Sequence, residues 1–375
     1  MMTPRHTVPR SIRYWILALV LGVLVAGAYS PVSRLVLAKQ FLQALASPNS
    51  STPAGTVREQ EVQVPGRRGP VRARLYLPPS GGLHLGIVVA HGVHYRGIDE
   101  RRLVPFAREL ARSGLVVLTP ELGDLADYRL TRASVDTIED AVIYLGQRKD
   151  TVSSEYVGLL GFSFAGGLSL VAASEPILKG KIRYVVSVGG HHDLERVFSF
   201  LLTNQIETPT GIVKAKAHDY GLAVVLYGNL GKFTSPEDLS PMRDVVRAWL
   251  HEDRPAAMTL APTLSPSNLA LFQLIEGQKL GALAPQLKEI LRQQHETSLA
   301  LSPKGKLSDI GVPVYLLHGA HDSVIPPSES VFCGLELGDR AHEVLVTPLI
   351  EHVEVSRSAE LREQFALVRF MARLF

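Results

Sequence analysis

Apolar and polar positions follow two alternating patterns along most of this 375-residue chain. From Arg58 onward, short apolar runs rich in β-branched residues alternate with stretches in which apolar residues recur every three or four positions. The runs predict buried strands, the stretches predict amphipathic helices, and their alternation predicts a mainly parallel sheet covered by helices. The predicted strands are Glu59–Val64, Val71–Leu77, Gly86–Ala90, Leu115–Thr119, Tyr156–Gly161, Tyr184–Val188, Val314–Leu317 and Glu343–Val346. The predicted helices are Glu100–Ser113, Ser134–Arg148, Phe164–Ser174 and Ala359–Leu374.

The alternation stops between residues 194 and 305, where helical stretches follow one another without a parallel strand between them. These stretches include Pro241–Leu250, Leu269–Leu280 and Pro285–His295. We therefore expect a doubly wound, mainly parallel α/β sheet formed by residues 58–193 and 306–375, with residues 194–305 as a helical insertion. Several large apolar side chains of the insertion need a surface to bury against. They are Phe198, Phe200, Leu201, Leu202, Phe272 and Leu274. We interpret most of them as the core of the insertion itself.

Twenty consecutive residues near the N-terminus, from Tyr14 to Ser33, carry no charge. A helix of that length spans about 30 Å, the thickness of the hydrocarbon core of a bilayer. Aromatic residues stand near both ends of the segment, and three arginines precede it, which favours a cytoplasmic N-terminus. We predict a basic segment at 1–13, a transmembrane anchor at 14–33, and a stalk and linker at 34–57, with the folded body on the outer side of the membrane.

The same segment has a second interpretation, as a cleaved signal peptide. Ala26, Gly27 and Ala28 supply the small residues that a signal peptidase needs after a short apolar region. Cleavage would release the body as a secreted or periplasmic protein. A buried helix of a soluble domain would need polar residues on one face, and none lies between Tyr14 and Ala28.

Composition and charge narrow the class of protein. With 46% hydrophobic and 20% charged residues, the chain is not disordered, collagen-like or a coiled coil. The net charge is +3, but residues 1–34 hold four arginines and no acid, so the folded body lacks the basic excess of a nucleic-acid-binding protein. Cys333 is the single cysteine, which excludes an intramolecular disulfide and a thiolate metal cluster, and we interpret it as a packed helix residue.

The chemistry of the chain begins at Ser163. An apolar strand runs from Tyr156 to Gly161 and is followed by the sequence Gly-Phe-Ser-Phe-Ala and a helix rich in small residues. A nucleophile at such a tight strand-to-helix turn needs small neighbours, and Gly161 and Ala165 meet that need. The pentapeptide occurs often by chance, but the strand before it and the helix after it favour a nucleophilic serine over an ordinary turn serine.

At this point the chain resembles the α/β-hydrolase family, over about residues 58–193 and 306–375. The family's acid commonly follows the penultimate strand, which implies Asp322 after the run Pro313–Leu317. Its histidine lies in the loop after the last strand, which implies His352. Such partners are needed because an imidazole must take the serine proton and a carboxylate must orient the imidazole. Asp193 also follows a strand and is the alternative acid.

The oxyanion formed by attack on a carbonyl needs two N–H donors. The resemblance implies the backbone of Phe164, which follows the nucleophile, and that of Val93, which follows His91-Gly92 after the third strand. Relatives similar to dienelactone hydrolase have a cysteine nucleophile, whereas this chain has a serine, like esterases and lipases. The scattered histidines form no metal-binding spacing, so we expect no metal and no dissociable cofactor.

We therefore expect a membrane-anchored serine hydrolase with a helical lid, which cleaves carboxylic esters or thioesters through an acyl-enzyme. One alternative is an amidase or peptidase with the same triad, because the triad does not encode the leaving group. Another is a catalytically silent, membrane-tethered binding protein. The expected partners are a hydrophobic small-molecule substrate and the membrane, not nucleic acid. The insertion that carries these six apolar residues is also expected to line an acyl pocket over Ser163, with a preference for medium or longer hydrophobic acyl chains over acetate.

Overall fold

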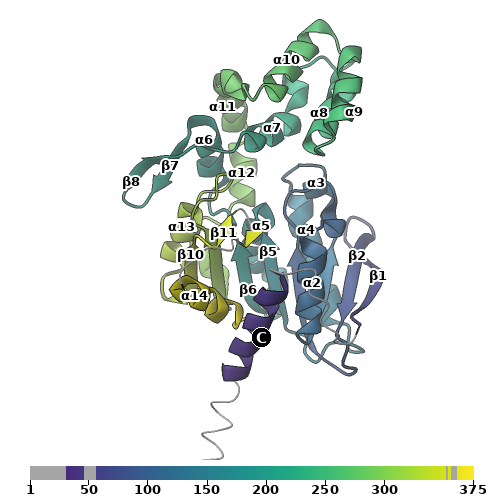
Figure 1. Cartoon of the computed structure of the whole chain (residues 1–375), viewed down its shortest axis with the longest axis vertical. Coiled ribbons are helices and arrows are strands. Elements are labelled where there is room, and N and C mark those ends of the chain that lie inside the picture. The colour runs from purple at the N-terminus through teal and green to yellow at the C-terminus, as the bar shows by residue number, and fades with distance from the viewer. Residues whose placement is uncertain (1–30, 46–55, 352–353, 356–360) are drawn as a thin grey trace, which may run out of the picture.

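The computed structural model describes residues 31–45, 56–351, 354–355 and 361–375. Eight strands form one sheet in the order β1-β2-β4-β3-β5-β6-β9-β10 (Figure 1). Each of the eight predicted strands is present in this sheet. The bounds are β1 Arg58–Val64, β2 Val71–Leu77, β3 Leu85–Ala90, β4 Leu115–Pro120, β5 Val157–Phe162, β6 Ile182–Val188, β9 Val314–Gly319 and β10 Ala341–Thr347.

The sheet is parallel from β4 to β10, whereas β1 and β2 are antiparallel to their neighbours. The parallel strands β4 and β9 are buried along their whole length, as expected for strands covered by helices on both faces. Successive residues of β3 illustrate the two faces. Ile87 and Val89 join one apolar core, and Val88 and Ala90 join the other. The prediction of a mainly parallel, doubly wound sheet is therefore confirmed.

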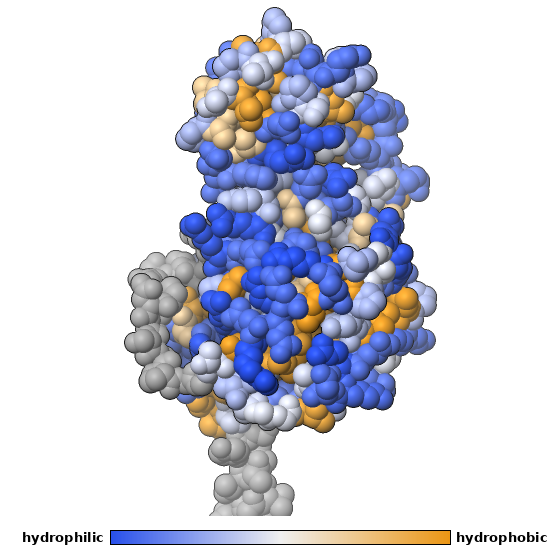
Figure 2. Space-filling model, turned by 90° about the vertical axis from the view of Figure 1, so that its right-hand side faces the viewer, coloured by the Kyte–Doolittle hydropathy of each residue, from blue (hydrophilic) through white to orange (hydrophobic). Residues whose placement is uncertain are grey.

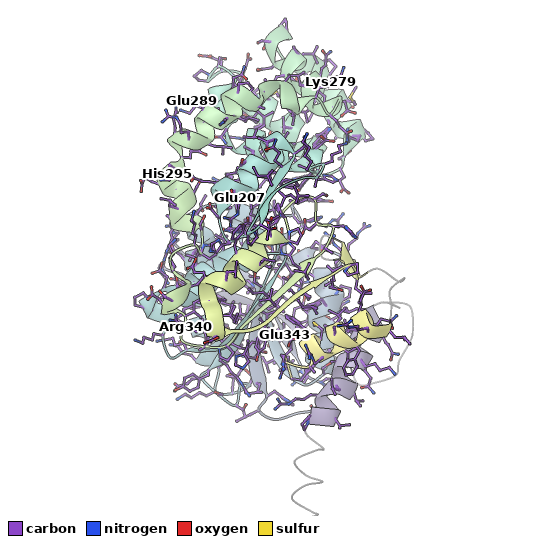
Figure 3. The ribbon with its side chains drawn as sticks, turned by 90° about the vertical axis from the view of Figure 1, so that its left-hand side faces the viewer. Glu207, Lys279, Glu289, His295, Arg340 and Glu343 are labelled. Carbon is purple, nitrogen blue, oxygen red and sulfur yellow. The ribbon has the colours of Figure 1, made fainter. Side chains whose placement is uncertain are left out.

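Helices cover both faces of the sheet. On one face lie α4 (Arg132–Gly146) and α5 (Phe164–Ser174), and on the other lie α2 (Leu103–Arg112) and α14 (Leu361–Met371). Glu343 of β10 fixes α14 by ion pairs of 2.7 Å to Arg369 and 3.5 Å to Arg373 (Figure 3). The C-terminal helix is thus held against the last strand of the sheet.

The chain between β6 and β9 forms a mainly helical unit that stands on one end of the sheet (Figure 1). Glu289 and His295 lie in this unit and Arg340 lies in the sheet body, so the two tiers are easily followed in Figure 3. The elements are α6 Leu194–Thr203, β7 Gln205–Thr208, β8 Gly211–Lys214, α7 Asp219–Gly228, α8 Leu239–Leu250, α9 Arg254–Leu260, α10 Pro266–Glu276, α11 Ala284–Gln293 and α12 His295–Leu301. The face shown in Figure 2 is mainly hydrophilic, with apolar patches on both tiers.

A buried ion pair ties the base of the insertion to the sheet body. Arg196 of α6 lies 2.5 Å from a carboxylate oxygen of Glu329, a fully buried residue of α13 (Ser328–Leu337). The other oxygen of Glu329 accepts hydrogen bonds of 2.9 and 2.8 Å from the amides of His192 and Asp193. Because one carboxylate holds both the guanidinium and the backbone before α6, the start of the insertion has a fixed direction.

The N-terminal helix (residues 31–45) differs from the stalk that the sequence predicted for residues 34–57. It packs against the sheet body between α2 and α14, where it is the purple helix of Figure 1. Ala38 is fully buried and Phe41 is 1% exposed. A helix with one apolar side can be free or packed against the body, and the sequence alone does not distinguish the two arrangements.

The predicted anchor lies almost wholly outside the described residues, since only residues 31–33 of it are included. Within the described ranges, the structure contains no helix with the length and apolar character needed to cross a bilayer. Val32, in the first described turn of the N-terminal helix, is 57% exposed.

Candidate active site

Ser163 lies at the sharp turn between β5 and α5, and its backbone is strained. Its φ is 54° and its ψ is −133°, a combination that residues with a side chain rarely adopt. The turn is held by hydrogen bonds of 2.8 Å from the Ser163 amide to the Val188 carbonyl and from the Gly166 amide to the Ser163 carbonyl. The side chain is therefore presented at the end of the sheet from which the insertion rises, as a nucleophile at such a turn requires.

Two glycines make room for this turn. A Cβ on Gly161 would lie 2.3 Å from the Ala165 carbonyl oxygen, and a Cβ on Gly92 would lie 3.1 Å from the Ser163 Cβ. The first distance is impossible without a shift of the backbone. Small residues at these positions are thus a steric requirement of the turn, which agrees with the reason given for Gly161 from the sequence.

The loop after β3 brings Val93 to the same place. The Nδ1 of His91 lies 2.7 Å from the Gly92 carbonyl oxygen, and the Leu122 amide donates to His91 Nε2 at 2.9 Å. Because Nε2 accepts this hydrogen bond, Nδ1 carries the proton and donates to the carbonyl. In a trans peptide the Val93 N–H points opposite to the Gly92 carbonyl, so the His91 ring sets the direction of the first predicted oxyanion donor.

Phe164, whose amide is the second predicted donor, is the first residue of α5 and is 6% exposed. Its N–H belongs to the first turn of the helix, where backbone amides have no partner within the helix. The positive end of the α5 dipole therefore lies beside Ser163 and favours a negative charge there. Val93 and Phe164 both line a cavity that Ser163 also lines.

Asp322 lies beyond the end of β9, two strands from β5 in the sheet, and is 5% exposed. Its Oδ1 accepts hydrogen bonds of 2.8 and 3.0 Å from the amides of Val324 and Ile325. These two contacts fix the carboxylate in one orientation. The nearby His318 has Nδ1 at 2.7 Å from the Ser330 hydroxyl and Nε2 at 2.8 Å from the Ile325 carbonyl, so both of its ring nitrogens are engaged.

The carboxylate of Asp193, the alternative acid, stabilises the base of the insertion. One of its oxygens accepts a 3.0 Å hydrogen bond from the Glu195 amide and so caps α6, and the other lies 2.8 Å from the Lys304 ammonium. The Lys304 ammonium helps to hold the pKa of Asp193 below its ordinary value, against the effect of burial, which is the largest influence and raises it. Both oxygens of this carboxylate are thus used by the base of the insertion.

His352 lies outside the described residues, so its ring has no position here. The chain that leads to it is described as far as Glu351. β10 pairs with β9 in parallel as far as Thr347 and Gly319, and the Ala320 amide donates to the Thr347 carbonyl at 2.9 Å. The chain therefore leaves β10 at the same edge of the sheet where Asp322 follows β9, five residues before His352.

Ser163 lies at the junction of two cavities. One, of about 140 Å³, extends along the sheet toward the N-terminal helix, and the other, of about 220 Å³, extends under the insertion. Of the six apolar insertion residues expected over Ser163, Phe198 and Leu201 line the second cavity. Phe200, Leu202, Phe272 and Leu274 do not line it, because they pack in or against the apolar core. This agrees with the interpretation of most of the six residues as core, and the acyl-pocket expectation is wrong for these four.

The insertion also touches the loop that carries Val93. The ring of Tyr95 stacks on that of His251, at the end of α8, with 4.3 Å between centroids. The insertion also contacts a second segment of the body, between β4 and α4, where the Tyr128 hydroxyl donates to the Leu250 carbonyl at 2.8 Å. Sequence reasoning missed these contacts, and it missed the role of His91 and the contribution of the N-terminal helix to a cavity. The His-Gly pair is the one signal in the sequence that pointed to the loop.

Comparison with known proteins gives two kinds of similarity. Mouse (Mus musculus) peroxisomal succinyl-coenzyme A thioesterase is 34% identical over 145 residues, which are 36% of this chain and 32% of that protein. Rat (Rattus norvegicus) acyl-coenzyme A thioesterase 1 is 37% identical over 129 residues, 34% of this chain and 29% of that protein. The chain thus spans about a third of the length of these curated relatives.

Among solved structures, a puromycin-hydrolyzing peptidase of Mycobacterium tuberculosis superimposes with a TM-score of 0.50 and 17% identity. The match covers 86% of this chain and 39% of that one. At this level of identity the likeness shows a shared fold. No family model matches the chain.

Proposed function

We propose that this chain, which has the α/β-hydrolase fold, is a serine hydrolase that cleaves carboxylic esters or thioesters through an acyl-enzyme on Ser163. The observation that carries the proposal is the strained backbone of Ser163, with φ of 54°, at a point where two cavities meet. Strain of this kind costs about 1 to 3 kcal/mol and persists where the surrounding structure imposes it, often at functional sites. The similarity to acyl-coenzyme A thioesterases supports an acyl substrate.

The proposed reaction uses three side chains and two amides. His352 takes the proton of the Ser163 hydroxyl as its oxygen attacks the substrate carbonyl, and Asp322 orients the imidazole and stabilises its charged form. The amides of Val93 and Phe164 stabilise the oxyanion. His352 then gives the proton to the leaving alcohol or thiol as the carbonyl–heteroatom bond breaks. Water, activated in the same way, hydrolyses the acyl-enzyme and restores the serine.

Asp322 is the preferred acid because its environment suits the role better than that of Asp193. Two amides already fix one oxygen of Asp322, while the oxygens of Asp193 cap α6 and pair with Lys304. A carboxylate that an ammonium neutralises stabilises an imidazolium less well. The chain after β10 also starts at the edge of the sheet where Asp322 lies.

The insertion acts as a lid in this proposal. It forms most of the wall of the larger cavity beside Ser163, and through His251 it stacks on the loop that carries Val93. A cover of this kind excludes water from the reacting carbonyl and strengthens the hydrogen bonds to the oxyanion. The fixed base at Arg196 and Glu329 confines any movement of the lid to the part beyond α6.

The chain is anchored in a membrane by residues 14–33, with the body on the outer side. The packed N-terminal helix supports a short distance between the folded body and the membrane segment. Ala38 and Phe41 are buried in the body, and they follow residue 33 by five and eight residues, about 8 to 12 Å along a helix. The active site would therefore be held near the bilayer surface rather than at the end of a flexible tether. Cleavage at Ala26–Ala28 would instead yield a free protein, and the mass of the mature N-terminus distinguishes the two.

Hydrolysis of a substrate panel by the full-length protein tests the proposal. We expect turnover of p-nitrophenyl esters and acyl-coenzyme A thioesters, slower or no turnover of the matching anilides, and loss of all activity in Ser163→Ala. Ser174→Ala, at the other end of the same helix, is the matched control and should retain activity. Preferential cleavage of anilides would establish an amidase instead, and binding without turnover would establish a silent member of the fold.

A further inference from the structure

The smaller cavity beside Ser163 is formed mainly by apolar side chains. It has a volume of about 140 Å³ and lies between the sheet, α2, α14 and the N-terminal helix. Leu160, Val186, Val188 and Leu317 form the sheet side of its wall. Apart from Ser163, its polar lining residues are His91, His94, Glu100 and Arg102, which all come from the segment between β3 and α2 that includes the loop with Val93. The cavity is thus a hydrocarbon-lined space that is open to the nucleophile.

The N-terminal helix forms part of this wall. Leu42 and Leu45 line the cavity together with Phe41, whose ring lies 5.2 Å from that of Phe106 in an edge-to-face arrangement. Phe106 in turn lies 5.0 Å from the ring of Phe162, the residue before Ser163. Three aromatic rings therefore connect the N-terminal helix with the turn of the nucleophile. Contacts of this geometry add to the energy of apolar burial and hold the helix in one position.

The polar residues of the larger cavity, under the insertion, are placed differently from those of the smaller cavity. They come from both the sheet body and the insertion rather than from one loop. Arg129, Asn229 and Gln294 contribute to its lining along with apolar side chains. A group that carries hydrogen-bonding atoms has partners there, whereas a hydrocarbon chain leaves these polar groups without water. The acyl side and the leaving-group side of the scissile carbonyl would therefore face cavities that differ in where their hydrogen-bonding atoms lie.

We infer that the smaller cavity binds the acyl chain of the substrate, so that the N-terminal helix is a wall of the acyl site and sets the chain length that the protein accepts. This inference rests on the proposed function and deepens it. An apolar cavity of about 150 Å³ holds a molecule as large as benzene, so this one accommodates roughly six carbon atoms. The leaving group lies under the insertion, which reverses the expectation that the insertion residues form the acyl pocket. The substrate class is an ester or thioester of a medium-length, unbranched fatty acid.

Chain-length selectivity of variants in the N-terminal helix tests the inference in the full-length protein. Wild-type kcat/KM for p-nitrophenyl esters should rise roughly fourfold per methylene from acetate until the cavity is full. This point lies near an eight-carbon acyl chain, because the carbonyl carbon and its neighbour stay beside Ser163 and about six carbons fill the cavity. Leu42→Trp and Leu45→Trp fill the cavity and should lower kcat/KM for the octanoyl ester at least tenfold, while the acetyl ester changes less than threefold. Leu42→Ala enlarges it and should move the optimum two or three carbons higher.

Val36→Trp is the matched control, because Val36 belongs to the same helix, is 49% exposed and does not line the cavity. It should leave the profile unchanged. Equal loss at every chain length in the leucine variants, or a profile that none of them alters, overturns the inference. Those outcomes leave the proposed function intact, because the wild type still hydrolyses esters. A wild type that hydrolyses no ester or thioester of any length overturns both.

Discussion

The Leu122 amide donates a 2.9 Å hydrogen bond to Nε2 of His91. This contact leaves the ring proton on Nδ1, which donates to the Gly92 carbonyl oxygen at 2.7 Å. The peptide that follows is therefore held with its N–H, that of Val93, turned the opposite way. A histidine outside the proposed triad thus controls one of the two amides proposed to stabilise the oxyanion, and its effect is open to test.

His91→Ala should lower kcat by about ten- to hundredfold with a smaller change in KM. Loss of one oxyanion donor costs about a hundredfold or more, and a donor that is only misdirected costs less. Steady-state kinetics on a short ester measures the effect. His84→Ala, at the opposite end of β3 from His91, is the control and should behave as the wild type. A rise in KM at constant kcat would contradict the assigned role.

Exchange of each candidate acid for its amide separates Asp322 from Asp193. Asp322→Asn should lower kcat by about 10³- to 10⁴-fold, because an amide neither orients the imidazole correctly nor stabilises its charge. Asp193→Asn should keep kcat within about threefold, since asparagine caps a helix as well as aspartate does and the lost pair with Lys304 lies at the base of the insertion. The reverse order of the two effects would move the acid to Asp193.

Backbone strain at Ser163 predicts a gain in stability when function is lost. Ser163→Gly and Ser163→Ala should both be inactive, but the glycine variant should be more stable than the alanine variant by about 1 kcal/mol. Glycine adopts a φ of 54° without strain, and this gain exceeds its larger loss of conformational entropy on folding. Denaturant unfolding of the two variants measures the difference. Equal stabilities would mean that the turn is not strained.

His191 predicts a loss of stability in acid. The ring is fully buried, donates from Nε2 to the Leu301 carbonyl, and has its pKa lowered by burial from 6.5 to about 4. Between these values the unfolded chain binds a proton that the folded chain does not. The stability is therefore complete above pH 6.5 and falls by about 3 kcal/mol as the pH drops to 4.

Denaturant unfolding across this pH range tests the assignment to His191. His191→Gln keeps an N–H donor for the Leu301 carbonyl but does not titrate, so most of this pH dependence should disappear in the variant. An unchanged slope between pH 6.5 and 4 would assign the effect to other groups.

The central strands β3, β4, β5, β6 and β9 were predictable from the sequence because they are almost entirely buried and form continuous apolar runs. The edge strands β1 and β10 were also predicted, although both are largely exposed. The hairpin β7–β8 was not predicted, because Gly211–Lys214 is exposed along its whole length and has no apolar run to mark it. The packed position of the N-terminal helix was also missed. A helical pattern with one apolar side predicts that this side is buried, but it does not identify the part of the protein against which the helix packs.

In the candidate site too, some features were predictable from the sequence and others were not. Ser163 and Asp322 stand at the ends of predicted strands, so their shared edge of the sheet followed from the topology. The insertion residues were judged by size and apolar character alone, which cannot separate Leu201, at a cavity, from Phe272, in the insertion's own core. The role of His91 depends on a hydrogen bond from Leu122, 31 residues away in the sequence, and no local pattern encodes it.

Reaction with a fluorophosphonate probe, followed by mass spectrometry of the labelled peptide, tests the central claim most directly. The probe forms a stable bond to a serine hydroxyl only where a base activates it and donors stabilise the negative oxygen. We predict a single adduct on Ser163 in the full-length protein, none in Ser163→Ala, and undiminished labelling in Ser174→Ala. A wild type that stays unlabelled, or an adduct on another serine that persists in Ser163→Ala, would contradict the assignment of Ser163 as the nucleophile.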